Sequence, residues 1–169
     1  DDQATARSIG DEPFQFYQKF DDIIVSVDAN RQRGIEKLIE LKQPDVILLD
    51  DAFQHRKVTA AFTILLTAYD NLYSEDIVLP TGNLREPRAG ATRADCIIVT
   101  KCPANLSSFE QKTIIKSLRP LTHQLVCFSS IMYSKTIYSE HNTKYLNVLK
   151  DTHITLVTGI ANPKPMIDY

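Results

Sequence analysis

Residues 44–51 have the sequence Pro-Asp-Val-Ile-Leu-Leu-Asp-Asp, an apolar run that ends in two adjacent carboxylates. The uninterrupted apolar segment 46–49 predicts a strand with both faces buried, because a half-exposed strand would alternate apolar and polar residues. In open α/β sheets, ligands bind beyond the carboxyl ends of the strands. The stretch therefore predicts that Asp50 and Asp51 lie at the binding edge of a parallel sheet.

Further short apolar runs lie on both sides of this stretch and alternate with helical patterns. A helix is predicted over 35–41 and ends before Pro44, because the residue before proline is disfavoured in the helical region. Another is predicted over 107–118, with Ser107 or Ser108 as its cap and Glu110 close behind. Strands are predicted at 23–27, 46–49, 61–68, 95–100, 125–128 and 154–157. This alternation predicts the α/β class, with a mainly parallel sheet flanked by helices.

The predicted organisation has three parts. Residues 1–128 form a partial core domain, 129–152 a ribbon or linker, and 153–169 the start of a second α/β unit. The polar, tyrosine-rich stretch 131–147 has no helical periodicity and predicts either a two-stranded ribbon or a linker. A length of 169 residues fits one domain plus a fragment, and both ends look like cuts.

Composition narrows the class of protein. Apolar residues make up 43% and charged residues 24%, and the formal net charge is −2, as in ordinary globular proteins. Basic and acidic residues are interspersed, so we expect no nucleic-acid partner. No apolar run approaches the ~20 residues that would span a bilayer.

The acid pair is the sharpest chemical signal. A carboxylate at a rigid strand end suits Mg²⁺, which binds one or two carboxylates together with phosphate oxygens and water. The alternative is that the aspartates only cap a helix. The Gln54 amide and the His55 imidazole follow directly, and both suit a phosphate or the orientation of a carboxylate.

Two further motifs have a functional and a structural interpretation. The loop 79–88, Leu-Pro-Thr-Gly-Asn-Leu-Arg-Glu-Pro-Arg, lies between two predicted strands and therefore at the same sheet edge. Arg85 in this loop offers a forked donor for phosphate, or it is only a solvated surface residue. Asp11, in Gly10-Asp11-Glu12-Pro13, is either a base or metal-shell group or an acidic residue favoured by a helix N-terminus.

A phosphate-binding P-loop is absent from the sequence. That loop needs two glycines five positions apart, followed by lysine and serine or threonine. No pair among Gly10, Gly34, Gly82, Gly90 and Gly159 has this spacing. If the protein uses a nucleotide, its phosphate-cradling loop lies outside these residues.

Four motifs in this order resemble the tetraacyldisaccharide 4'-kinase family across essentially the whole chain. They are Gly10 to Pro13, Asp50 to His55, Leu79 to Glu86, and Thr158 to Pro163 (Thr-Gly-Ile-Ala-Asn-Pro). The resemblance implies a P-loop kinase-like core, a β-ribbon and a smaller C-terminal domain. It also implies transfer of the ATP γ-phosphoryl group to the 4'-hydroxyl of a tetraacyldisaccharide 1-phosphate. The product would be lipid IV-A, in the biosynthesis of lipid A.

The resemblance also implies residue roles. Asp11 would be the catalytic base and Glu12 would support substrate or metal positioning. Mg²⁺ would be held by Asp50 and Asp51. The remaining site residues would be Gln54, His55, Arg85, and Arg31 or Arg33, which would line the site or contact substrate or phosphate.

The family pattern also includes parts that this sequence lacks. They are the P-loop, an upstream amphipathic helix that associates with the membrane, and a downstream histidine-containing segment. We therefore expect the full-length enzyme to work at the cytoplasmic face of the inner membrane of a Gram-negative cell. We expect the fragment to be soluble and inactive by itself. The alternatives are another P-loop kinase or NTPase fragment, or a non-catalytic interaction module.

Overall fold

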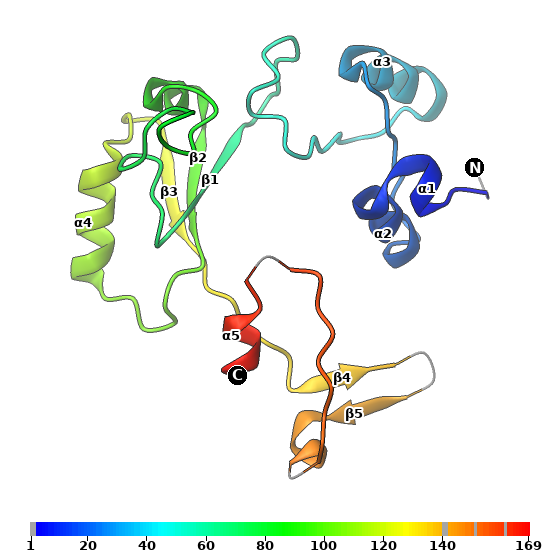
Figure 1. Cartoon of the computed structure of the whole chain (residues 1–169). Helices are drawn as coiled ribbons and strands as arrows, with labels where there is room; N and C mark the ends of the chain where they lie inside the picture. Colours follow the sequence, from blue (N-terminus) through cyan, green and yellow to red (C-terminus); the bar gives the residue numbers. More distant parts are fainter. Residues whose placement is uncertain (1–2, 140–141, 151, 161) are drawn as a thin grey trace. The chain divides into compact units, whose positions relative to one another are not determined.

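The computed structural model describes residues 3–139, 142–150, 152–160 and 162–169. The chain divides into two compact units (Figure 1). Unit 1 comprises Asp1–Leu65 and Ile77–Asp95, and unit 2 comprises Leu66–Asp76 and Cys96–Tyr169. The domain boundaries that the sequence suggested, at 128 and 152, remain a prediction.

The helices of unit 1 begin at recognisable caps. Helix α1 (Ala6–Ile9) has Thr5 as its N-cap, and α2 (Asp11–Lys19) follows Gly10. Helix α3 (Arg31–Lys42) begins after Asn30, whose side chain accepts a hydrogen bond from the backbone N–H of Arg33. The predicted end of this helix before Pro44 is confirmed, but α3 begins four residues earlier than the predicted residue 35. The 3₁₀ helix η1 covers Arg88–Arg93.

Two predicted strands of unit 1 are wrong within the described residues. The segments 23–27 and 46–49 belong to no helix and no sheet. Val46 and Leu48 are largely exposed, whereas Ile47 and Leu49 are half-buried. A strand needs a partner for its backbone hydrogen bonds, and no described segment pairs with either run. An apolar run therefore does not by itself predict a strand that is paired in a sheet.

A three-stranded sheet has the order β1-β2-β3, with β1 (Ile64–Ala68), β2 (Cys96–Thr100) and β3 (Leu125–Phe128). Strands β2 and β3 are parallel, with Cys96 opposite Leu125 and Val99 opposite Phe128. Within unit 2, Ile97 and Val99 of β2 are fully buried. A small core of α/β type is therefore confirmed, although β3 alternates exposed and half-buried residues.

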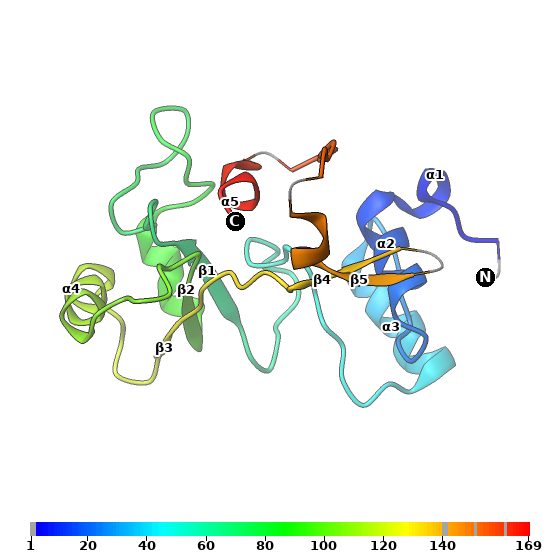
Figure 2. The ribbon, with the colours of Figure 1, turned by 90° about the horizontal axis from the view of Figure 1, so that it is seen from below.

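Helix α4 (Ser108–Leu118) lies beside this sheet in both ribbon views (Figure 1, Figure 2). Its cap is Ser107, and the Glu110 side chain accepts a hydrogen bond from the Ser107 backbone in return, which confirms the predicted cap. Ile114 and Leu118 are its buried residues. The Tyr73 hydroxyl donates a hydrogen bond to the carbonyl of Leu118 and so ties the end of α4 to the chain after β1.

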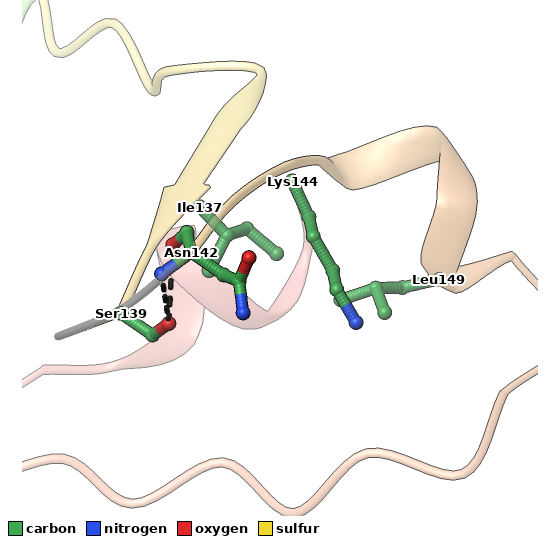
Figure 3. Close-up of a pocket in the computed structure, with 5 residues that line it drawn as sticks. All are labelled: Ile137, Ser139, Asn142, Lys144 and Leu149. Carbon is green, nitrogen blue, oxygen red and sulfur yellow. Dashed lines mark hydrogen bonds between the residues drawn. The ribbon is translucent and has the colours of Figure 1, made fainter.

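The polar stretch after β3 contains an antiparallel ribbon of β4 (Thr136–Tyr138) and β5 (Thr143–Tyr145). The 3₁₀ helix η2 (Leu146–Leu149) and helix α5 (Lys164–Ile167) follow. A pocket beside the ribbon is lined by Ile137, Ser139, Asn142, Lys144 and Leu149 (Figure 3). The predicted strand 154–157 does not form among the described residues.

Candidate functional site

The acid pair lies in a turn of unit 1 that directly follows the apolar segment 46–49. Asp51 has a φ of 42°, in the left-handed region that aspartate tolerates better than most residues. The next turn is closed by a hydrogen bond of 2.8 Å from the His55 N–H to the Ala52 carbonyl. Both carboxylates are exposed, so they are accessible to a ligand.

Arg31 reaches this turn from the first position of α3. Its Nη2 lies 3.3 Å from the carbonyl oxygen of Asp50 and 3.5 Å from that of Asp51. The guanidinium therefore touches the backbone behind the two carboxylates rather than the carboxylates themselves. Arg31 is the first residue of α3, and the Asn30 cap fixes where this helix begins. The positive charge of Arg31 therefore lies next to the acid pair.

Arg85 reaches the same turn from the loop 79–88. Its Nη1 donates a hydrogen bond to Asp51 Oδ2 at 3.1 Å. The two side chains are exposed to 63% and 72%, so the ion pair contributes little to stability. Its importance is that it brings together two motifs that are far apart in the sequence.

The backbone just before Arg85 is held by a small turn. Leu84 donates its N–H to the Ile77 carbonyl at 3.1 Å and accepts a hydrogen bond from Leu79 at 3.0 Å. Gly82 donates to the Val78 carbonyl at 3.3 Å. These bonds fix the point from which Arg85 extends toward the acid pair.

Arg93, at the end of η1, makes a second connection between the two loops. Its Nη2 donates to Glu86 Oε1 at 2.7 Å and to the Phe53 carbonyl at 3.1 Å. Its guanidinium carbon also lies 4.7 Å from the centroid of the Phe53 ring. No functional role for Arg93 or Glu86 was predicted from the sequence. The sequence feature that could have indicated this contact is a glutamate and an arginine seven residues apart, with Gly90 between them.

Gln54 and His55 complete the turn. Gln54 is exposed, and its carbonyl accepts a hydrogen bond from the Arg56 N–H at 3.0 Å. His55 is half-buried, and its Nδ1 is buried without a hydrogen-bond partner among the described residues. A buried polar atom without a hydrogen-bond partner is energetically costly.

Asp11 and Glu12 occupy the first turn of α2, where the helix dipole favours acidic residues. Both are exposed. Within the described residues, neither forms a hydrogen bond or ion pair with the 50–56 turn. The structure therefore does not bring the Gly-Asp-Glu-Pro motif into contact with the acid pair, and the catalytic roles of Asp11 and Glu12 remain predictions.

Arg33 has a different partner from Arg31. Its Nε and Nη2 lie 2.9 and 2.6 Å from the two carboxylate oxygens of Asp28, a bidentate pair. The Arg33 hydrogen bond, followed by the one from the Asn30 N–H, lowers the pKa of Asp28 from 3.8 to about 2. A side chain on the buried Gly34 would lie 3.0 Å from Asp28 Cβ, so glycine permits this close approach. Of the two arginines predicted as phosphate contacts, only Arg31 lies at the acid pair.

Other features of the described residues add no second site. In the described ranges, no group of three or more His, Cys, Asp or Glu side chains is arranged to hold a metal ion. The pocket beside the ribbon has Lys144 as its one charged side chain. None of the helices in the described part of the chain has both the length and the apolar content needed to cross a membrane. Ala161, in the fourth motif, lies outside the described residues.

Comparison with known proteins points to one family. Residues 1–169 match the family described as tetraacyldisaccharide-1-P 4'-kinase. A protein of Flavobacterium johnsoniae named tetraacyldisaccharide 4'-kinase is 51% identical over the whole chain and 50% of its own length. Proteins with that name from Bacteroides thetaiotaomicron and Porphyromonas gingivalis are 44% and 40% identical, over 98% and 95% of the chain and 47% and 46% of theirs. The chain spans about half the length of these curated relatives. No solved structure matches it.

Proposed function

The chain belongs to the tetraacyldisaccharide-1-P 4'-kinase family, and we propose that the protein carrying it phosphorylates a lipid A precursor. The reaction transfers the γ-phosphoryl group of ATP to the 4'-hydroxyl of a tetraacyldisaccharide 1-phosphate, and lipid IV-A is the product. Four acyl chains keep this acceptor in a membrane, so we place the full-length enzyme at the cytoplasmic face of the inner membrane. Support comes from the family match along the whole chain and from the charged groups around Asp51.

The single observation that carries the proposal is the contact between Arg85 and Asp51. Phosphoryl transfer needs a carboxylate-held metal and cationic donors that stabilise charge on the phosphoryl oxygens. The Asp50–Asp51 turn supplies carboxylates, and Arg85 places a guanidinium within 3.1 Å of one of them. Arg31 adds a second cationic group against the backbone of the same turn.

The donor chemistry of the turn fits Mg²⁺. Carboxylate oxygens are the hard ligands that Mg²⁺ prefers, and one or two are enough when phosphate oxygens and water fill the other positions. Asp50 and Asp51 would hold the ion. When bound, Mg²⁺ would neutralise charge on the ATP phosphates.

The protein groups would then position the reactants. Arg85 would rotate from Asp51 to a phosphate oxygen, since an exposed ion pair is weak enough to exchange partners. Arg31 would keep the carbonyl side of the turn fixed, so that the two carboxylates face the phosphates. Gln54 and His55 would line the same site.

The proton of the sugar hydroxyl needs an acceptor. We assign this role to Asp11, with Glu12 supporting the position of the substrate or the metal. The exposed start of α2 leaves both carboxylates accessible. A base acts by taking the hydroxyl proton as the new P–O bond forms. The phosphate-cradling loop would come from residues outside this chain, because the P-loop spacing is absent from it.

The test uses the full-length protein, ATP labelled at the γ-phosphate, and a tetraacyldisaccharide 1-phosphate. We expect one labelled phosphate per acceptor, located at the 4' position by mass spectrometry. A matched acceptor that lacks the 4'-hydroxyl should receive none. Equal labelling of both acceptors, or no labelling of either, would contradict the proposed reaction.

A further inference from the structure

We propose that Arg93 is a positioning residue for phosphoryl transfer. It joins the loop that carries Arg85 to the turn that carries the acid pair, and so sets the distance between them. The inference rests on the proposed function, because the site being positioned is the one assigned there. Arg93 itself touches neither the acid pair nor Arg85 through any of its three contacts.

The three contacts use the particular chemistry of arginine. One nitrogen, Nη2, binds both the Glu86 carboxylate and the Phe53 carbonyl, at 2.7 and 3.1 Å. The guanidinium carbon lies over the Phe53 ring, 4.7 Å from its centroid. A lysine ammonium has no planar face, so it can replace the charge but not the full set of contacts.

Gly90 leaves free the space that the Glu86 carboxylate occupies beside the backbone of η1. A Cβ built on Gly90 would lie 2.6 Å from Glu86 Cδ and 2.8 and 2.9 Å from its two carboxylate oxygens. Such distances are too short for real atoms. The carboxylate therefore packs directly against the backbone of η1, and a side chain at position 90 would displace it.

The Arg93–Glu86 pair is better shielded than the Arg85–Asp51 pair. Its side chains are 32% and 23% exposed, compared with 63% and 72%. Water screens the Arg85–Asp51 pair strongly, so this pair is too weak to hold the two loops together. The contacts of Arg93 with Glu86 and Phe53 are better shielded from water, and they fix the position of the Arg85 loop relative to the acid pair.

The two anchor points of Arg93 are next to the reacting groups. Glu86 directly follows Arg85, and Phe53 comes two residues after Asp51. A shift of either anchor therefore moves a cationic donor relative to a carboxylate. Misplacement of about 1 Å in a catalytic site costs up to about 100-fold in rate.

The experiment compares variants of the full-length enzyme by kcat and KM with both substrates. We expect Arg93→Ala to lower kcat about tenfold to 100-fold while KM for the acceptor stays within about twofold. Gly90→Ala keeps Arg93 but displaces Glu86, so it should cause a similar loss. Lys112→Ala, which removes an exposed charge from α4, is the matched control and should leave kcat unchanged.

Two readouts separate positioning from a general loss of structure. Guanidinium ion at a non-denaturing concentration should restore part of the kcat of Arg93→Ala, whereas sodium chloride at equal ionic strength should not. Arg93→Lys should retain an intermediate kcat. The proposal is overturned if Arg93→Ala keeps a wild-type kcat, or if its loss tracks a lower melting temperature and guanidinium restores nothing.

Hydrogen exchange of the backbone amides tests the role of Arg93 without the acceptor substrate. In Arg93→Ala, backbone amides of 51–56 and 82–86 should exchange faster than in the wild type, and those of α4 should not. If the wild-type enzyme transfers no phosphate, the proposed function fails, and faster exchange in both loops would then support only the part of the inference in which Arg93 joins the two loops. Unchanged exchange would overturn that role whatever the activity.

Discussion

Arg85 donates a hydrogen bond of 3.1 Å to the carboxylate of Asp51, a residue 34 positions earlier in the chain. This contact lies where two loops meet. Taken separately, the acid pair could be only a helix cap and Arg85 only a solvated surface residue. Together they place a carboxylate and a forked donor at one point. That combination is what phosphoryl transfer needs.

Arg85→Ala in the full-length enzyme should raise KM for ATP by about tenfold or more, because a hydrogen bond to a charged group is worth about 1.5–3 kcal/mol. Arg85→Lys should fall between the wild type and Arg85→Ala, since it keeps the charge but loses the fork. Steady-state kinetics at saturating acceptor measure both. An unchanged KM for ATP in Arg85→Ala would remove Arg85 from the phosphate site.

Asp50→Asn should weaken metal binding in the presence of ATP. Removing one carboxylate leaves a hard cation with one fewer charged ligand, so we expect affinity to fall about tenfold or more. Mn²⁺ is the probe, and the electron paramagnetic resonance signal of the free ion gives the binding curve. Asp45→Asn changes an exposed residue just before the apolar segment 46–49; it is the matched control and should bind Mn²⁺ as the wild type does.

Asp28→Asn should lower the melting temperature at pH 7 by removing the bidentate bond to Arg33. The folded-state pKa of Asp28 is lowered to about 2, so its contribution to stability is present above the unfolded pKa of about 3.9. As the pH falls below about 4 toward 2, that contribution is lost. The gap in melting temperature between wild type and variant should therefore close over this range, and a constant gap would contradict the pairing.

Ser107→Ala should reduce the free energy of unfolding by about 1 kcal/mol, because it removes the cap of α4. Ser108 is the next residue and begins the helix, so Ser108→Ala is the matched control and should change stability little. Urea unfolding monitored by circular dichroism measures both. Equal effects of the two substitutions would show that the cap is not where the hydrogen bonds place it.

Local signals predicted α3 and α4, because caps and terminators act over a few residues, but they did not predict α1, α2 or α5. The cap at Ser107 and the end of α3 before Pro44 both follow from bonds within one turn of helix. The start of α3 at Arg31 was missed because the Asn30 cap precedes a charged turn with no apolar residue. Apolar periodicity cannot detect a polar first turn.

Strands and side-chain pairs depend on partners distant in the sequence. The run 46–49 is as apolar as β2, yet only β2 has neighbours in the described residues to complete its ladder. The sequence predicted that the Arg85 loop and the acid pair share a sheet edge; the two do meet through Arg85 and Asp51, but 46–49 belongs to no sheet of the described residues. Sequence order gave no reason to expect that Arg93 would bond to the Phe53 carbonyl, because that contact depends on how η1 folds.

The most direct test of the proposed site is the rate of γ-phosphoryl transfer to the tetraacyldisaccharide acceptor by full-length Asp51→Asn. Asparagine keeps the size and the tolerance for the left-handed backbone, and removes only the charge. We expect the rate to fall at least about 100-fold, as when one charge-stabilising group is removed, while Asp45→Asn keeps the wild-type rate. A folded Asp51→Asn enzyme that transfers phosphate at the wild-type rate would show that this turn is not the phosphoryl-transfer site.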